Sequence, residues 1–296
     1  MSPGGVNRRQ ILGAAATPLA ASLAAAPLAA SFAENRSGVP GLRLSFQERF
    51  AEPVSFYDPV TRAGRWKTNY WFGDQSDQSS RSLPDERQIY VDRSYCGISP
   101  FVPAKGGLRI LADKNRRPDD ARLFSPYTGR VKPFAYTSGL LTTETSFRQR
   151  YGYFEATMAF PQVRGCWPAF WLLGPPHTDH AGDELDVVEW VASNPRRLFL
   201  SAHIGGKGQS TWVDGFETRA PVAYGLLWTR DKLKWFVNGK QVHERPNPGI
   251  HQPMYMLLNL AIGGWDGNLP EDPGGFPAAL LITSVEAYAL RDGGAG

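Results

Sequence analysis

Short runs in which apolar and polar residues alternate follow one another along most of this 296-residue chain. Alternation with a period of two is typical of β-strands that bury one face, and the Gly, Pro, Asn and Asp clusters between the runs are typical of turns. No segment keeps a helical period for more than a turn or two. The clearest predicted strands span residues 108–112, 138–145, 153–160, 198–204, 232–237 and 255–262.

One turn and the lack of internal repeats define the organisation further. Asn238-Gly239 predicts a two-residue hairpin, because a type I′ turn needs positive φ at both central positions. We predict an all-β fold, a sandwich of two antiparallel sheets over residues 42–291, after a linker at residues 34–41 and before a tail at residues 292–296. The polar loops at residues 71–84 and 113–134 either border a binding cleft or are surface insertions.

Three acids interrupt the apolar residues of the segment GDELDVVEW at residues 182–190. On a regular strand Glu184 and Asp186 share a face, and Glu189 is out of phase. One extra residue near Val187-Val188, a β-bulge, would bring all three acids to one surface. Paired carboxylates suit glycoside hydrolysis, and the intervening Asp can separate the two glutamate pKa values. The alternative is that these are solvated charges on a half-exposed strand.

The first 33 residues have the features of an export signal. The segment NRRQIL at residues 7–12 is a twin-arginine pattern, and an Ala-rich, mildly apolar stretch follows it. Pro18 and Pro27 interrupt that stretch, which disfavours a membrane anchor. We therefore expect a periplasmic or secreted protein without stable membrane insertion. Cys96 and Cys166 can pair in an oxidising compartment, but their spacing does not decide whether they do.

Composition and charge limit the classes of partner and cofactor that the protein is expected to bind. The net charge of +4 gives little support for nucleic-acid binding, because Arg8 and Arg9 contribute half of it and no basic run exceeds two residues. The many aromatic residues suffice for a large core and a binding surface. No His/Cys/Asp cluster suggests a catalytic metal, and no Gly-rich phosphate loop is present. We expect a monomer that needs no cofactor.

Several motifs, in this order along the chain, resemble glycoside hydrolase family 16, whose members include laminarinases, lichenases, agarases and carrageenases. The resemblance implies a β-jelly roll with a concave substrate cleft. The extra residue in the acidic motif resembles the bulged type of laminarinases and related bacterial enzymes, which also include galactan hydrolases. The motifs lie at residues 44–50, 66–70, 136–139, 151–156, 165–171, 184–189, 233–239, 258–264 and 285–288.

The resemblance implies a role for each acid. Glu184 would be the nucleophile, Glu189 the general acid/base, and Asp186 the residue that holds and tunes the nucleophile. The family retains anomeric configuration, so the two glutamate carboxyls should stand about 5 to 5.5 Å apart.

The segments WPAFW at residues 167–171 and NLAIGG at residues 259–264 look more like the glucanases of the family. They favour endo-hydrolysis of β-1,3- or mixed β-1,3/1,4-glucan. One alternative substrate is a galactan or a bacterial exopolysaccharide, which the enzyme would hydrolyse or transglycosylate. Another alternative is a non-catalytic carbohydrate-binding jelly roll, although such a protein has no need for all three acids.

Five residues are candidates for sugar binding. Indole faces stack on pyranose rings, so Trp167 and Trp171 are either sugar platforms or core residues. Asn259 matches a cleft-facing Asn of the family. His203 is either a substrate contact or a structural histidine, and Trp265 matches an aromatic at the cleft rim. Trp228 and Trp235, by contrast, are predicted core residues.

Many family members bind a structural calcium, partly through an Asp of the last strand. Thr283 stands at the matching place here, and loss of a carboxylate weakens a site for a hard cation. A calcium would then depend on Glu48 and backbone oxygens, and we do not expect one.

Overall fold

The computed structural model describes residues 41–72, 80–83, 85–94, 97–115, 122–125, 130–264 and 274–291. These residues form strands β1 to β18 and contain no α-helix, which confirms the all-β prediction. The described part of the chain also has no helical segment with the length and hydrophobicity that a membrane span requires. The export signal, most of the linker, the tail, Trp265 and Cys96 lie outside the described residues. Cys166 is buried.

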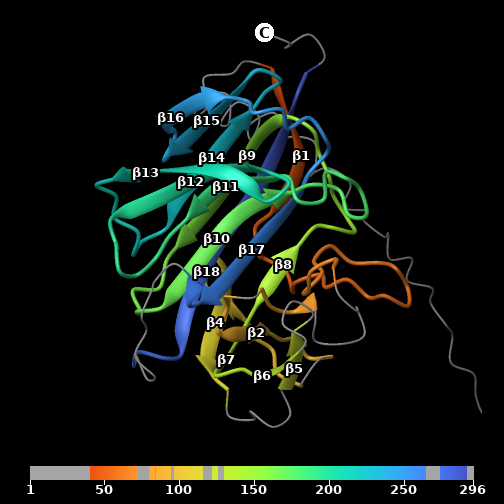
Figure 1. Cartoon of the computed structure of the whole chain (residues 1–296), viewed down its shortest axis with the longest axis vertical. Coiled ribbons are helices and arrows are strands. Elements are labelled where there is room, and N and C mark those ends of the chain that lie inside the picture. The colour runs from red at the N-terminus through yellow and green to blue at the C-terminus, as the bar shows by residue number, and fades with distance from the viewer. Residues whose placement is uncertain are drawn as a thin grey trace, which may run out of the picture.

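Two sheets stack face to face, and the six-stranded sheet lies in front in Figure 1. Its strands follow the order β13-β12-β11-β10-β17-β8, and every neighbouring pair is antiparallel. The strands of this sheet are β8 (Leu140–Thr142), β10 (Cys166–Leu173), β11 (Glu184–Glu189), β12 (Arg197–Ile204), β13 (Lys207–Asp214) and β17 (Tyr255–Ile262).

The second sheet has ten strands, with β16-β15-β14-β9-β18-β4-β7-β2 in order, β1 paired to β18 and β3 paired to β4. The β2–β7 pair is parallel, in contrast to the all-antiparallel prediction. The strands are β1 (Leu42–Glu48), β2 (Gln88–Tyr90), β3 (Phe101–Ala104), β4 (Gly107–Lys114), β7 (Tyr136–Ser138), β9 (Gly152–Ala159), β14 (Val222–Trp228), β15 (Lys232–Val237), β16 (Lys240–Pro246) and β18 (Ala278–Leu290).

The main core lies between the sheets and follows from the alternation of each strand. On β10, Phe170 and Leu172 enter the core, and on β11 Leu185 does so. Phe154 and Met158 of β9 contribute from the opposite sheet. The side chains at the alternate positions of β10 and β11 therefore point away from the core. We call that side of the six-stranded sheet the cleft face.

Two local predictions turned out differently. The run at residues 138–145 is not one strand: β7 belongs to the ten-stranded sheet and β8 to the six-stranded sheet, with Gly139 between them. A Cβ at Gly139 would lie 2.8 Å from a methyl of Ile110, so the chain crosses between the sheets where only Gly fits. The loop predicted at residues 113–134 contains a hairpin of β5 (Arg122–Ser125) and β6 (Arg130–Pro133).

The predicted hairpin turn is confirmed. Asn238 and Gly239 connect β15 to β16 with φ values of 49° and 76°. The Asn238 side chain also accepts a hydrogen bond from the backbone N–H of Ala223 on β14, at 2.9 Å. The turn is therefore tied to the neighbouring strand as well as to its own hairpin.

Candidate active site

A bulge in β11 brings the three acids together. Phe170 of β10 pairs with Val188, and the next residue, Trp171, pairs with Asp186, so Val187 is the extra residue. On the other side, the β12 register also shifts between Asp186 and Glu189. Val187 and Val188 are both in the core. The predicted bulge is therefore present, and Glu189 shares the cleft face with Glu184 and Asp186.

The acids line a pocket of about 90 Å³ on the cleft face. Asp186 is 2% exposed and Glu189 is 6% exposed, whereas Glu184 is half-buried. Apolar and aromatic side chains form much of the remaining wall, with Ala169 and Trp171 from β10 and Ala261 from β17. Little water reaches the Asp186 and Glu189 carboxyls, so the ionisation of the three acids depends on one another and on a few hydrogen bonds.

Burial and mutual repulsion change the acidity of both glutamates. Burial is the largest cause that raises the pKa of Glu184, and the charges of Asp186 and Glu189 and a hydrogen bond with Asp186 raise it further. Burial also raises the pKa of Glu189, and the charge of Asp186 adds to it. Because the three carboxyls interact, their protons leave in steps that belong to the group. Such a group can keep one carboxyl protonated while another is ionised.

Asp186 is held from the core side by the opposite sheet. Trp235 of β15, a buried residue as predicted, donates its indole N–H to the Asp186 carbonyl oxygen at 2.8 Å. On the cleft face, Nε2 of His203 lies 3.4 Å from Oδ2 of Asp186, and this oxygen makes no hydrogen bond. The His203 ring packs over Gly208 of β13, where a Cβ would lie 2.1 Å from Nδ1. His203 therefore stands beside the acids, directly across from Glu184.

The two Trp residues of β10 face the cleft but have different contacts. Trp167 is half-buried, and its indole N–H donates to Oε1 of Glu189 at 2.9 Å. This hydrogen bond lowers the pKa of Glu189, against the effect of burial. Trp171 is 8% exposed and donates to Oδ1 of Asn259 at 2.8 Å. Trp167 can therefore contact both an acid and a ligand, whereas Trp171 is mainly part of the cleft floor.

A chain of hydrogen bonds continues from Asn259 to an acid that the sequence analysis did not single out. Asn259 donates to the hydroxyl of Tyr90 at 3.0 Å, and Tyr90 donates to Oε1 of Glu86 at 2.7 Å. The other Glu86 oxygen accepts the backbone N–H of Leu83 at 2.6 Å. Glu86 is 2% exposed and also lines the pocket. The only sequence signal was its place just after the polar loop at residues 71–84, of which Leu83 lines the pocket.

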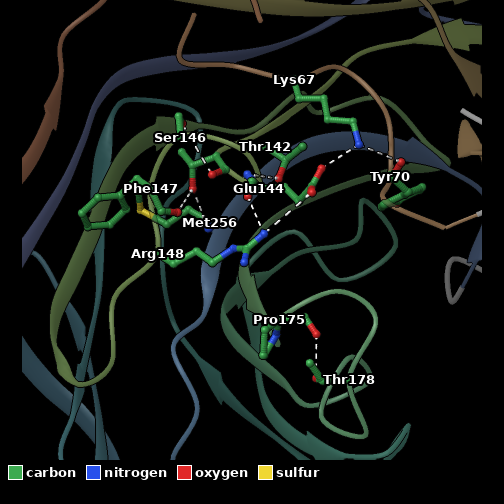
Figure 2. Close-up of polar contacts among 11 residues, drawn as sticks. Lys67, Tyr70, Thr142, Glu144, Ser146, Phe147, Arg148, Pro175, Thr178 and Met256 are labelled. Carbon is green, nitrogen blue, oxygen red and sulfur yellow. Dashed lines mark hydrogen bonds and ion pairs between the residues drawn. The ribbon is translucent and has the colours of Figure 1, made fainter. Parts of the chain in front are cut away.

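The segment around Tyr70 covers one side of the cleft face. Tyr70 packs edge-on against Trp171, with ring centroids 6.3 Å apart, and lines the pocket. Figure 2 shows how its backbone is anchored: Lys67 reaches both the Tyr70 carbonyl and the Glu144 carboxylate. The Lys67 to Glu144 distance is 2.6 Å, and Arg148 donates to the Glu144 carbonyl at 2.9 Å. This ion-pair network fixes the wall beside the acids.

Two places in the described structure offer candidate metal ligands. Glu184, Asp186 and His203 each offer one ligand atom, and these atoms lie within 4.8 Å of one another. Glu184 and Asp186 are two of the three acids that line the pocket, and His203 stands beside them. The Glu48 carboxylate does not fit a calcium ion, because each of its two oxygens already accepts hydrogen bonds from two N–H groups. The donors are the backbone N–H groups of Arg49 and Phe50, the Arg65 guanidinium and the Trp66 indole.

The chain is similar in sequence to known enzymes. Residues 104–281 match the model of the family described as glycosyl hydrolases family 16. The chain is 32% identical to the endo-1,3-1,4-beta-glycanase ExsH of Rhizobium meliloti (strain 1021) over 241 residues. It is 34% identical over 236 residues to the endo-1,3-1,4-beta-glycanase EglC of the same organism. Each match covers 77% of this chain and 48% of the relative, so the chain spans about half the length of these relatives.

The fold is also similar to solved structures. The endo-beta-1,3-glucanase of Pyrococcus furiosus superposes with a TM-score of 0.66 at 25% sequence identity, over 84% of this chain and 94% of that chain. The laminarinase catalytic domain of Thermotoga maritima superposes with a TM-score of 0.66 at 22% identity. These likenesses confirm the jelly-roll sandwich that the sequence predicted.

Proposed function

Because this chain belongs to family 16 of the glycosyl hydrolases, we propose that it is an endo-acting β-glucanase that retains anomeric configuration. One observation carries the proposal: the Val187 bulge, through which Glu184, Asp186 and Glu189 face one pocket. Double-displacement glycoside hydrolysis needs two carboxyls at one cleft, one protonated and the other ionised, and a coupled acidic group of this kind can hold those two states together.

Each step has a carboxyl group for its task. Glu189, whose pKa is raised by burial, donates its proton to the glycosidic oxygen as the bond to the anomeric carbon breaks. Ionised Glu184 attacks the anomeric carbon and forms a glycosyl ester. Glu189, now ionised, takes a proton from water, the water oxygen attacks the same carbon, and Glu184 leaves as a carboxylate.

The neighbours of the acids have positioning tasks in this mechanism. Asp186 hydrogen-bonds Glu184 and holds it in place, and the Trp235 hydrogen bond fixes the Asp186 backbone. Trp167 orients the Glu189 carboxyl through its indole N–H. The Nε2 atom of His203 lies 3.4 Å from the Asp186 carboxyl, where the imidazole can help to hold that side chain. Such fixed donors and acceptors reduce the reorganisation that the reaction needs.

We propose β-1,3- or mixed β-1,3/1,4-glucan as the substrate. The two Rhizobium meliloti relatives, at 32% and 34% identity, are both named as 1,3-1,4-beta-glycanases. An apolar floor around Ala169 and Trp171 suits the hydrophobic faces of pyranose rings. Asn259 and Glu86 offer hydrogen-bonding groups at the same pocket.

The test is the release of reducing ends by the purified protein. The panel contains laminarin, barley mixed-linkage glucan, agarose, carrageenan and a succinylated bacterial exopolysaccharide, with Glu184→Gln as the control. We expect activity on laminarin or barley glucan that Glu184→Gln lacks. Activity only on a galactan or the exopolysaccharide would contradict the proposed glucan substrate but agree with the proposed hydrolytic reaction. No activity on any polymer would favour a carbohydrate-binding protein.

We also propose that the protein is exported through the twin-arginine pathway. The support is the NRRQIL pattern with its Ala-rich continuation, ahead of the described residues. A fusion of residues 1–33 to a reporter that must fold before export should carry it out of the cytoplasm. Replacing Arg8 and Arg9 by Lys should stop this transport. Transport that is unaffected by the double replacement would contradict the proposal.

A further inference from the structure

An exposed Trp lies on the cleft face, two strands away from the acids. The side chain of Trp212, on edge strand β13, is 54% exposed. Its neighbour Val213 packs against the main core, so Trp212 points to the opposite face of the sheet. The register places it in one row with an acid: Glu189 pairs with Phe199 of β12, and Phe199 pairs with Trp212.

The Trp212 ring is held on one side by a fixed cation. The Arg197 guanidinium carbon lies over the indole, 5.0 Å from the ring centroid. Arg197 is itself fixed by two hydrogen bonds to the Asp214 carboxylate, at 2.8 and 3.0 Å. Arg197 and Asp214 are cross-strand partners next to the Trp212 row. Trp212 is still 54% exposed with Arg197 over its ring, so much of the indole is accessible to a ligand.

An open indole in this place needs an explanation. The other residues of β13 that share the cleft face are Gly208, Ser210 and Asp214, and no apolar neighbour covers the ring from this strand. An exposed aromatic side chain on an edge strand favours aggregation with other chains. Such a residue is therefore a candidate binding site. A rigid indole beside a carbohydrate cleft is a stacking surface for a sugar ring. Two strand spacings, about 10 Å, separate it from β11, which is within reach of a bound oligosaccharide.

We propose that Trp212, held in place by its contact with Arg197, is a sugar-binding subsite at the outer end of the cleft. It takes a pyranose ring of the polysaccharide chain whose cleavage site lies at the acids. The inference rests on the proposed function for the class of ligand, and it adds the direction of the bound chain, from β11 across β12 to β13. Phe199, between the two, lies under that path.

The experiment measures binding without cleavage. In the Glu184→Gln background, affinity electrophoresis in gels with laminarin or barley glucan gives the apparent Kd. Trp212→Ala should raise this Kd about five- to tenfold, and Trp212→Phe should raise it less, because a ring face remains. Phe56→Ala is the matched control: Phe56 is 41% exposed but packs against Phe101 of β3, away from the cleft face. Thermal unfolding of each variant checks that it is folded.

The outcomes separate this inference from the proposed function. If Trp212→Ala binds either glucan as tightly as its parent does, the subsite is wrong, even when the wild-type enzyme cleaves both polymers. If the wild-type protein cleaves nothing but its glucan binding falls with Trp212→Ala, the subsite stands and the hydrolase proposal fails. If the parent binds neither glucan, the subsite is overturned as a glucan site.

Discussion

Burial and hydrogen bonding act in opposite directions on Glu189. Burial and the charge of Asp186 raise its pKa, and the Trp167 indole N–H lowers it because it stabilises the ionised form. These opposing effects fix the pKa of Glu189. Above that pH, Glu189 no longer carries the proton that the leaving oxygen needs. The indole N–H of Trp167 on β10 therefore lowers the alkaline limit of the proposed reaction, against the effects of burial and Asp186.

Trp167→Phe should move the alkaline limb of the kcat/KM profile to higher pH. The variant loses the hydrogen bond that favours ionised Glu189, so the pKa rises and the protonated form persists further into the alkaline range. A pH series of kcat/KM on laminarin or barley glucan measures this shift. Trp171→Phe is the control, because its indole donates to Asn259 and not to an acid. A limb that stays fixed or moves to lower pH in Trp167→Phe would contradict the assignment.

Glu189→Gln should be more stable than the wild type at neutral pH. A carboxyl with a raised folded-state pKa stabilises the fold fully only below its unfolded pKa, and this stability is lost as the pH rises through the folded pKa. Gln has no such loss and still accepts the Trp167 hydrogen bond. Thermal unfolding at pH 4 and pH 8 should give a Tm difference that grows with pH, by about 2–4 °C for each kcal/mol.

The surface variant Glu52→Gln is the control for this series, since Glu52 is exposed. A Glu189→Gln advantage that is equal at both pH values would mean that ionisation of Glu189 does not cost stability. A variant less stable than the wild type at pH 8 would contradict the account more directly.

At the scale of strands, the bulge of β11 involves both neighbouring strands and one strand of the opposite sheet. The bulge disturbs the register on both neighbours, and Trp235 from the opposite sheet binds the Asp186 carbonyl at that point. The phase of Glu184, Asp186 and Glu189 is enough to predict the bulge from sequence, because only an extra residue brings them to one face. The Trp235 hydrogen bond could not be predicted, since it depends on how two sheets stack.

Trp235→Phe should lower kcat more than it changes KM. The loss of the indole N–H leaves the Asp186 carbonyl without this partner, at a cost of about 1–3 kcal/mol of stability, and lets the acid-bearing bulge shift. Steady-state kinetics on the proposed glucan substrate and urea unfolding measure both effects. Trp228→Phe is the matched control, because this buried Trp donates to the Ile250 carbonyl, away from the acids. Equal kcat losses in the two variants would mean that Trp235 contributes only to core packing and not to the position of the acids.

The position of edge strand β13 follows from a turn that is visible in the sequence. Gly205 and Gly206 have φ values of 56° and 76°, as a two-residue hairpin turn requires. A turn at this Gly-Gly pair fixes the pairing of β12 with β13, and therefore predicts that Phe199 faces Trp212. The sequence predicts the strand at residues 198–204, whereas the polar composition of β13 gives no clear alternation.

At the scale of the whole molecule, one sheet separates the core from the site. The core-facing residues of β10 and β11 bind the six-stranded sheet to its partner, and their alternate neighbours make the pocket. This division follows from alternation, so the sequence predicts which side chains of a strand are in the core. The strand order and the position of the segment around Tyr70 and Glu86 do not follow from alternation, because they depend on contacts between distant parts of the chain.

The most direct test of the proposed reaction is the anomeric configuration of the first product. Proton NMR of a glucan oligosaccharide during the first minutes of cleavage follows the anomeric proton before mutarotation. If Glu184 forms a glycosyl ester and Glu189 activates the water, the new reducing end appears first as the β-anomer. An initial α-anomer would mean direct attack by water, and it would contradict the roles assigned to Glu184 and Glu189.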